Sequence, residues 1–237
     1  MNDSTITLLA SIIDGSVTEI ENSDVLTIGD YAFADCSVLT TVNFPVAETI
    51  FDNAFQNCYN LTTVSFPAVK TIGIYAFQNC SALATASFPA ATTISGSAFY
   101  ACSALTTVSF PNVTTINTYA FYNCTSLTTA SFPSATTIGN GAFRSCSALS
   151  AVSFPNITSI GSNAFYECGN LAELNLVGVK SVPLLKNINA FDRTPISDYA
   201  LPDGGKGSVY VPASLYSDFL AATNWSRISS VIVSIGE

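Results

Sequence analysis

One spacing dominates this chain of 237 residues: its seven cysteines recur at intervals of 22 residues. They are Cys36, Cys58, Cys80, Cys102, Cys124, Cys146 and Cys168. Other columns keep the same step, including an Ala-Phe pair before each cysteine, a leucine three residues after it, and six Phe-Pro pairs. One unit reads L-x-x-V-x-F-P-x-V-x-x-I-x-x-x-A-F-x-x-C-x-x. This period predicts a solenoid, because one unit cannot bury its apolar columns alone, whereas stacked units can.

Each unit divides into two halves. The segment LTTVSFP predicts a β-strand that ends at its proline, since proline has no N–H to give to a strand ladder. The second half, such as TINTYAFYNC, turns its isoleucine, Ala-Phe pair and cysteine inward through a turn or short helix. The isoleucine column runs from Ile28 to Ile160, and Val182 continues it. About eight units at the usual strand spacing of about 4.8 Å predict a body about 40 Å long.

The two ends depart from the repeat, as terminal repeats do. We predict an N-terminal cap over residues 1–16, with an amphipathic segment from Ser4 to Ile13. The solenoid occupies residues 17–192, with degenerate first and last repeats.

The final repeat brings its Ala-Phe pair four residues late, with the extra residues inside VPLLKNIN. A C-terminal cap of one strand and one helix follows over residues 193–237. Its elements are the glycine-rich turn PDGGKG, the strand SVYVP, and a helix that Ser214 caps, with Leu215, Phe219 and Leu220 facing inward.

The unit AFxxCxxLxxVxFPxVxxIG resembles the BspA-like leucine-rich repeat family over about residues 17–192. The tail, TPI followed by GKGSVYVPASLYSDFLAATNWSRI, is similar to the closing segment of many such proteins. The resemblance implies an α/β repeat solenoid of right-handed, leucine-rich-repeat-like form. Its parallel strands would line the concave face, and turns or short helices the convex face. It also implies non-catalytic binding, because known relatives are mostly adhesins and surface proteins; short versions resemble proteins of phages of gut bacteria.

The seven cysteines are predicted to form a buried, reduced column. Stacking at about 4.8 Å with parallel side chains does not suit a disulfide, whose Cβ atoms converge to about 3.8 Å. The spacing offers none of the clustered pairs typical of zinc sites. In such a column cysteine acts as a small hydrophobic residue.

Two surfaces are candidates for contact with a partner. The outward strand positions carry serine and threonine, which are also ordinary solvent-facing strand residues. Tyrosine rows on the turn side are the stronger candidate, since exposed tyrosines anchor proteins or stack on sugars. The alternative is that they only cover the edge of the core. The predicted partner-binding residues are Tyr100, Tyr119, Tyr122 and Tyr166.

Charge and composition limit the remaining functions. The net charge is −9, and residues 1–52 hold nine acids and no base. This balance argues against nucleic-acid binding. The acidic block could bind calcium or a basic partner. We favour a simpler interpretation, in which repulsion between like charges prevents end-to-end stacking of solenoids. No apolar stretch is long enough to span a bilayer, so we expect no membrane insertion.

The chain has no histidine, no G-x-S-x-G nucleophile elbow, no P-loop and no G-x-G-x-x-G motif, so we predict no enzyme, no metal and no cofactor. The predicted function is a binding or adhesion module that recognises a protein or glycan on a cell surface. The alternative is a structural or accessory component of a larger assembly such as a phage tail or virion. The start of the sequence has no signal-peptide pattern, and a cell-surface or virion-associated location is expected.

Overall fold

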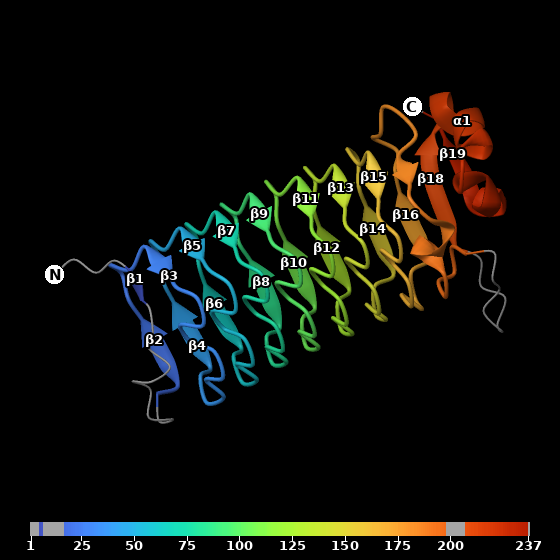
Figure 1. Cartoon of the computed structure of the whole chain (residues 1–237). Coiled ribbons are helices and arrows are strands. Elements are labelled where there is room, and N and C mark those ends of the chain that lie inside the picture. The colour runs from blue at the N-terminus through green and yellow to red at the C-terminus, as the bar shows by residue number, and fades with distance from the viewer. Residues whose placement is uncertain (1–4, 7–16, 198–206, 237) are drawn as a thin grey trace.

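The computed structural model of this chain describes residues 5–6, 17–197 and 207–236. It is an elongated solenoid whose strands stack along one axis, with short helices at the C-terminal end (Figure 1). This arrangement confirms the expected parallel-strand repeat solenoid. Turns connect the strands of the described repeats, and the last repeat also contains a short 3₁₀ helix, η1 (Ile188–Phe191). The one α-helix among the described residues, α1 (Tyr216–Ala221), lies in the C-terminal region.

Two strands, rather than the single strand expected, form in each unit. The isoleucine positions form a parallel sheet of nine two-residue strands. These strands are β1 (Thr5–Ile6), β3 (Thr27–Ile28), β5 (Thr49–Ile50), β7 (Thr71–Ile72), β9 (Thr93–Ile94), β11 (Thr115–Ile116), β13 (Thr137–Ile138), β15 (Ser159–Ile160) and β17 (Leu184–Leu185). β1 lies within the segment expected as an N-terminal cap and pairs with β3 of the solenoid; the rest of residues 1–16 lies outside the described residues.

The predicted strands form the second surface of the solenoid. The first three make one parallel sheet: β2 (Glu19–Glu21), β4 (Thr41–Asn43) and β6 (Thr63–Ser65). Seven more make the next: β8 (Thr85–Ser87), β10 (Thr107–Ser109), β12 (Thr129–Ser131), β14 (Ala151–Ser153), β16 (Glu173–Asn175), β18 (Ser208–Pro212) and β19 (Ile232–Ile235). Most pairs keep the 22-residue register, as between Val42 and Val64.

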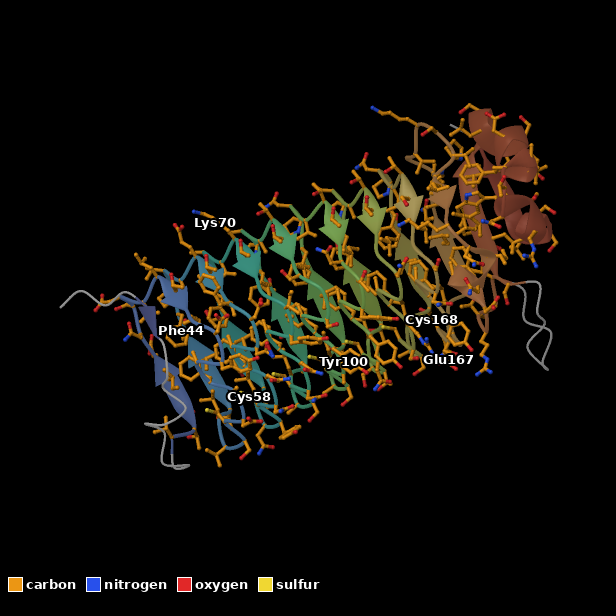
Figure 2. The ribbon with its side chains drawn as sticks, in the orientation of Figure 1. Phe44, Cys58, Lys70, Tyr100, Glu167 and Cys168 are labelled. Carbon is orange, nitrogen blue, oxygen red and sulfur yellow. The ribbon has the colours of Figure 1, made fainter. Side chains whose placement is uncertain are left out.

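Turns with left-handed backbone join the strands along one edge of the solenoid. Seven successive described units repeat two such positions, with φ near 55° to 63°, four residues apart, as at Tyr119 and Asn123, and the last unit keeps only the second, at Arg193. The Ala-Phe pair between them enters the core, and the residue after the phenylalanine turns outward. Tyr100 and Glu167 lie along the edge that these turns form, whereas Lys70 lies along the opposite edge (Figure 2).

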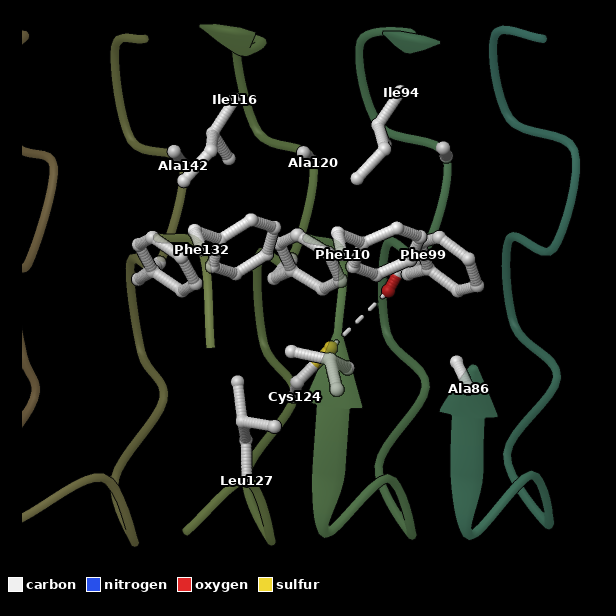
Figure 3. Close-up of a cluster of buried hydrophobic side chains, with 14 of the residues drawn as sticks. Ala86, Ile94, Phe99, Phe110, Ile116, Ala120, Cys124, Leu127, Phe132 and Ala142 are labelled. Carbon is white, nitrogen blue, oxygen red and sulfur yellow. Dashed lines mark hydrogen bonds between the residues drawn. The ribbon is translucent and has the colours of Figure 1, made fainter. Parts of the chain in front are cut away.

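Phenylalanine rings fill the core in two interleaved columns. Phe99 stacks on Phe121 of the next unit with ring centroids 5.3 Å apart, and it tilts against Phe110 at 5.8 Å (Figure 3). Both columns are fully buried in the central units. Since each ring packs on its own copy one unit away, the phenylalanine repeat determines the stacking register.

The cysteine column packs beside these rings, and its thiols make hydrogen bonds. All seven cysteines are free and buried. The thiol of Cys124 donates to the carbonyl oxygen of Phe99 over 3.2 Å, a contact drawn in Figure 3. The same contact, at 3.0 to 3.2 Å, recurs from Cys58 to Cys168. The expectation of a purely apolar role is therefore incomplete, because each of these thiols also occupies a buried carbonyl.

The last repeat differs from the expected register. Leu185, not Val182, pairs with Ile160, so the chain runs three residues longer before it rejoins the sheet. Val182 lies half-buried against the core, outside the strand. The carbonyl of Pro183 in the extra loop accepts a 2.7 Å hydrogen bond from the indole N–H of Trp225. A contact with the C-terminal region therefore holds this longer loop in place.

The C-terminal region confirms the SVYVP strand as β18 and changes the predicted helix. Residues Ala213–Leu215 form a 3₁₀ turn, so the helix begins two residues after Ser214 and has no side-chain cap. It ends at Ala221, and a 3₁₀ segment over Trp225–Val231 leads into β19, which was not predicted. Phe219 is buried as expected, whereas Leu215 and Leu220 are half-buried. The glycine-rich turn lies outside the described residues except for Gly207.

Candidate partner-binding site

The four predicted tyrosines gather on one edge of the solenoid, and an arginine joins them. Tyr100 and Tyr122 stack with centroids 4.7 Å apart, and Tyr119 meets Tyr122 edge-on at 5.7 Å. The guanidinium carbon of Arg144 lies 5.7 Å from the Tyr122 ring centre and 4.7 Å from that of Tyr166. We call these five residues the tyrosine–arginine edge.

The repeat explains this alignment. Tyr100, Tyr122, Arg144 and Tyr166 occupy the same position in four successive units, 22 residues apart, directly after the buried phenylalanine. Our prediction missed Arg144, although its place in the column was readable from the sequence. The column continues toward the N-terminus with Gln78 and Gln56, whose side chains share a 2.6 Å hydrogen bond.

Tyr119 reaches the edge from the neighbouring turn position. Its φ is 55°, and 38 % of its surface is exposed. Its ring lies over Gly141, where an added Cβ would overlap the ring carbons. Asparagine, serine and tyrosine occupy the same position in other units at similar φ values. The absence of a side chain at Gly141 therefore makes room for the Tyr119 ring, and the backbone conformation alone does not require glycine.

The chemistry of the edge is aromatic and locally cationic. Tyr100 has a raised pKa, first because its burial removes water, and then because of Tyr122 and other nearby tyrosines; Arg144 lowers it. Tyr122 lies between Tyr100 and Arg144, one face of Tyr100 lies against Tyr122, and Tyr166 lies beside Arg144. The edge therefore presents ring edges to a partner, and few open ring faces.

Beyond Tyr166 the column meets a second charged group. Arg193 lies 5.6 Å from the Tyr166 ring and forms an ion pair with Glu167 at 2.8 Å. The other carboxylate oxygen of Glu167 accepts a 3.0 Å hydrogen bond from Ser145. Each oxygen of Glu167 therefore has a partner, and no carboxylate among the described residues forms an ion pair with Arg144.

A second candidate surface lies on the sheet of longer strands, and sequence analysis missed its main features. We call it the sheet-face hollow, a depression of about 440 Å³. Its lining residues are Thr128, Thr129, Ala130, Ala151, Val152, Ser153, Glu173, Asn175 and Tyr210. Serine, threonine and alanine cover most of this face, and the larger side chains of β16 and β18 form a wall at one end.

The wall residues carry the only charge and aromatic ring of the hollow. Glu173 and Asn175 flank the predicted inward Leu174, so their outward positions were readable from the sequence. Tyr210 was not, because β18 lies 35 residues further along the chain and joins β16 only in the folded structure, with Asn175 opposite Tyr210.

The remaining candidates have structural roles in this fold. No group of three acidic or cysteine side chains among the described residues is arranged to hold a metal ion. Two acids of the N-terminal block act in turns: Asp30 accepts from the N–H of Asp52, and Asp52 accepts from that of Ile74. No described helix is both long and apolar enough to cross a membrane.

Comparison with known proteins agrees with this architecture. A family model described as the BspA type leucine rich repeat region matches in six copies, over residues 14–128 and 70–195. The repeats define a leucine-rich-repeat solenoid, and the chain belongs to the BspA-type leucine-rich repeat family. A search of curated proteins gave no match.

Solved structures show the same fold. A leucine rich cell surface protein from Faecalibacterium prausnitzii is 27 % identical, with a TM-score of 0.65. The match covers 93 % of this chain but 65 % of that protein, so this chain spans just under two thirds of its length. The leucine-rich repeat protein of T. pallidum is 23 % identical over 71 % of this chain and 73 % of its own, with a TM-score of 0.52.

Proposed function

We propose that this protein is a non-catalytic binding module that recognises a protein partner on a cell surface. The observation that carries the proposal is the tyrosine–arginine edge, a continuous row of the residue types that dominate binding energy at protein interfaces. The similarity to a cell surface protein supports the location.

The packing of the edge favours a protein over a stacked sugar. Sugar stacking needs an open ring face, and neighbours along the column take both sides of Tyr122 and one face each of Tyr100 and Tyr166. A protein partner can use ring edges and phenol hydroxyls, which combine apolar contact with hydrogen bonding. The rings are also held by their neighbours, so binding costs little side-chain entropy.

The test is binding of the labelled chain to bacterial cells, epithelial cells and matrix proteins. Tyr119→Ala removes an exposed ring without opening the core, and Tyr31→Ala is the matched control, since Tyr31 has the same turn position and is 57 % exposed. We expect saturable binding that weakens about tenfold in Tyr119→Ala and stays unchanged in Tyr31→Ala.

Equal binding by wild type and both variants would contradict a role for the edge. An absence of binding to every surface, with recovery of the chain inside assembled particles, would contradict adhesion and favour a structural component of an assembly.

The sheet-face hollow favours a second candidate function, glycan binding. Its volume lies in the range of small-ligand sites, and a carboxylate, an amide and one tyrosine border a floor of small side chains. Glycan-array binding that is lost in Tyr210→Ala and kept in Tyr119→Ala would favour this candidate over the edge.

A further inference from the structure

Arg144 is a fixed cation at the centre of the tyrosine–arginine edge. Tyr122 and Tyr166 lie on its two sides along the column, with the guanidinium nearer to Tyr166. Aromatic rings hold a guanidinium by cation–π attraction and restrict its orientation. A ligand would therefore approach the terminal N–H donors at the rim of the group, because the rings lie on its two sides.

This cation has no ion-pair partner within the described part of the chain. Its Nε is buried and makes no hydrogen bond, and no described carboxylate lies within ion-pair distance. The terminal nitrogens also make no hydrogen bond within that part, and Arg144 as a whole is half-buried. Glu167, one unit away, is already bound by Arg193 and Ser145.

The wider charge distribution permits an acidic ligand here. Residues 53–166 contain no acid, although the chain carries a net charge of −9. The acids of residues 1–52 begin four units from Arg144, about 19 Å at the usual strand spacing. That separation is more than twice the Debye length of about 8 Å at physiological ionic strength, so their repulsion is largely screened.

We propose that Arg144 is the receptor for a carboxylate on an acidic segment of the protein partner. This inference rests on the proposed binding function and specifies the partner's chemistry. A carboxylate is planar and matches the guanidinium fork with two parallel hydrogen bonds.

The site can be observed directly by NMR, because the chain has three arginines, Arg144, Arg193 and Arg227. The probe is end-blocked hexaglutamate, with hexaglutamine as the uncharged control. The Nε–Hε signal of Arg144 is expected to shift and saturate with hexaglutamate, to stay unchanged with hexaglutamine, and to return toward its free position as salt is added.

Three variants locate the effect. Arg144→Gln removes the charge and should weaken hexaglutamate binding about tenfold or more. Arg144→Lys keeps the charge but loses the fork, and should weaken it to an intermediate degree. Arg227→Gln removes an exposed arginine of the C-terminal region and should leave the affinity unchanged.

Unchanged affinity in Arg144→Gln, or no binding at millimolar hexaglutamate, would overturn the inference. Stronger competition by phosphate or sulfate than by acetate would overturn the choice of a carboxylate. Cell binding distinguishes the two proposals: if Arg144→Gln binds cells as wild type does while Tyr119→Ala does not, the carboxylate inference fails and the proposed function stands.

Discussion

At the scale of single residues, the cysteine column combines packing with hydrogen bonding. Each thiol from Cys58 to Cys168 fills a buried position beside the phenylalanine rings and donates to a carbonyl of the preceding unit. In the central units that carbonyl also accepts a backbone N–H, as Phe99 does from Cys102 at 3.3 Å. The column therefore ties neighbouring units together.

Burial of the thiols predicts a loss of stability in alkali. Desolvation raises the pKa of Cys102 far above its ordinary value, and burial with nearby Cys58 and Asp35 raises that of Cys36 to about 11. A raised folded-state pKa stabilises the fold fully below the unfolded pKa of about 8.5, and this contribution is lost as pH rises above it. We expect the unfolding free energy, measured in urea, to fall between about pH 8.5 and pH 10.

One buried thiol contributes at most about 1.4 kcal/mol per pH unit to that slope. Cys102→Ala should be less stable at neutral pH, because it loses the hydrogen bond of the thiol to Phe77. Its unfolding free energy should also decline less steeply in alkali, because one titrating thiol is removed. A slope that is the same in wild type and Cys102→Ala would contradict the role of the thiol.

Gly141 gives a second prediction at this scale. Gly141→Ala should displace the ring of Tyr119, because the new methyl group would overlap it. Adhesion should weaken as in Tyr119→Ala, and stability should fall by about 1 kcal/mol, as expected for a non-glycine residue at positive φ. Asn163→Ala, at the same turn position in the next unit, is the control and should leave the Tyr119 NMR signals in place.

At the scale of elements, the C-terminal region closes the solenoid through one tryptophan. Trp225 is fully buried, packs edge-on against Phe219 at 5.2 Å, and lies 6.1 Å from Phe191, the last ring of the phenylalanine column. Its indole N–H binds the carbonyl of Pro183. Trp225 thus joins the last irregular repeat to the helical segments of the C-terminal region.

Trp225→Phe should destabilise the protein by about 1–3 kcal/mol, because it leaves the carbonyl of Pro183 buried without its donor. Urea unfolding followed by circular dichroism measures this change. Tyr216→Phe, which removes one hydroxyl at a half-buried position of α1, is the control and should change stability by much less. Equal effects of the two variants would show that the indole hydrogen bond contributes little.

At the scale of the whole molecule, the longer-strand sheet nearest the N-terminus has an edge strand of acidic character. Within the described residues, β2 is the first strand of its sheet, and Glu19 and Glu21 are exposed on it. Charged side chains on an edge strand prevent pairing with another chain. Glu21 also accepts a 2.9 Å hydrogen bond from Asn43 of the next strand.

The double variant Glu19→Gln and Glu21→Gln should self-associate end to end, since it removes the repulsion and keeps the acceptor for Asn43. Sedimentation velocity at low salt should show an association constant about tenfold higher than that of wild type. Glu173→Gln makes the same chemical change on a strand paired on both sides and should stay as wild type. If wild type, the double variant and Glu173→Gln associate to the same extent, the charges on the edge strand β2 do not control self-association.

Repetition explains how much of the fold and site was predictable. A strict period makes each residue contact its own copy in the next unit, so the buried phenylalanine and cysteine columns, and the contact of Tyr100 with Tyr122, follow from spacing. The second strand of each unit was missed because two residues are too few to show alternation.

Tertiary structure alone decided what lies beyond the period. Spacing placed Val182 in the isoleucine column, but the longer loop held by Trp225 puts Leu185 there instead. Likewise, only the pairing of β18 with β16 brings Tyr210 beside Asn175. Where the repeat ends, the 22-residue spacing no longer predicts which residues are in contact. Packing against the last units of the core then determines which distant segments, such as β18 and the segment of Trp225, lie beside them.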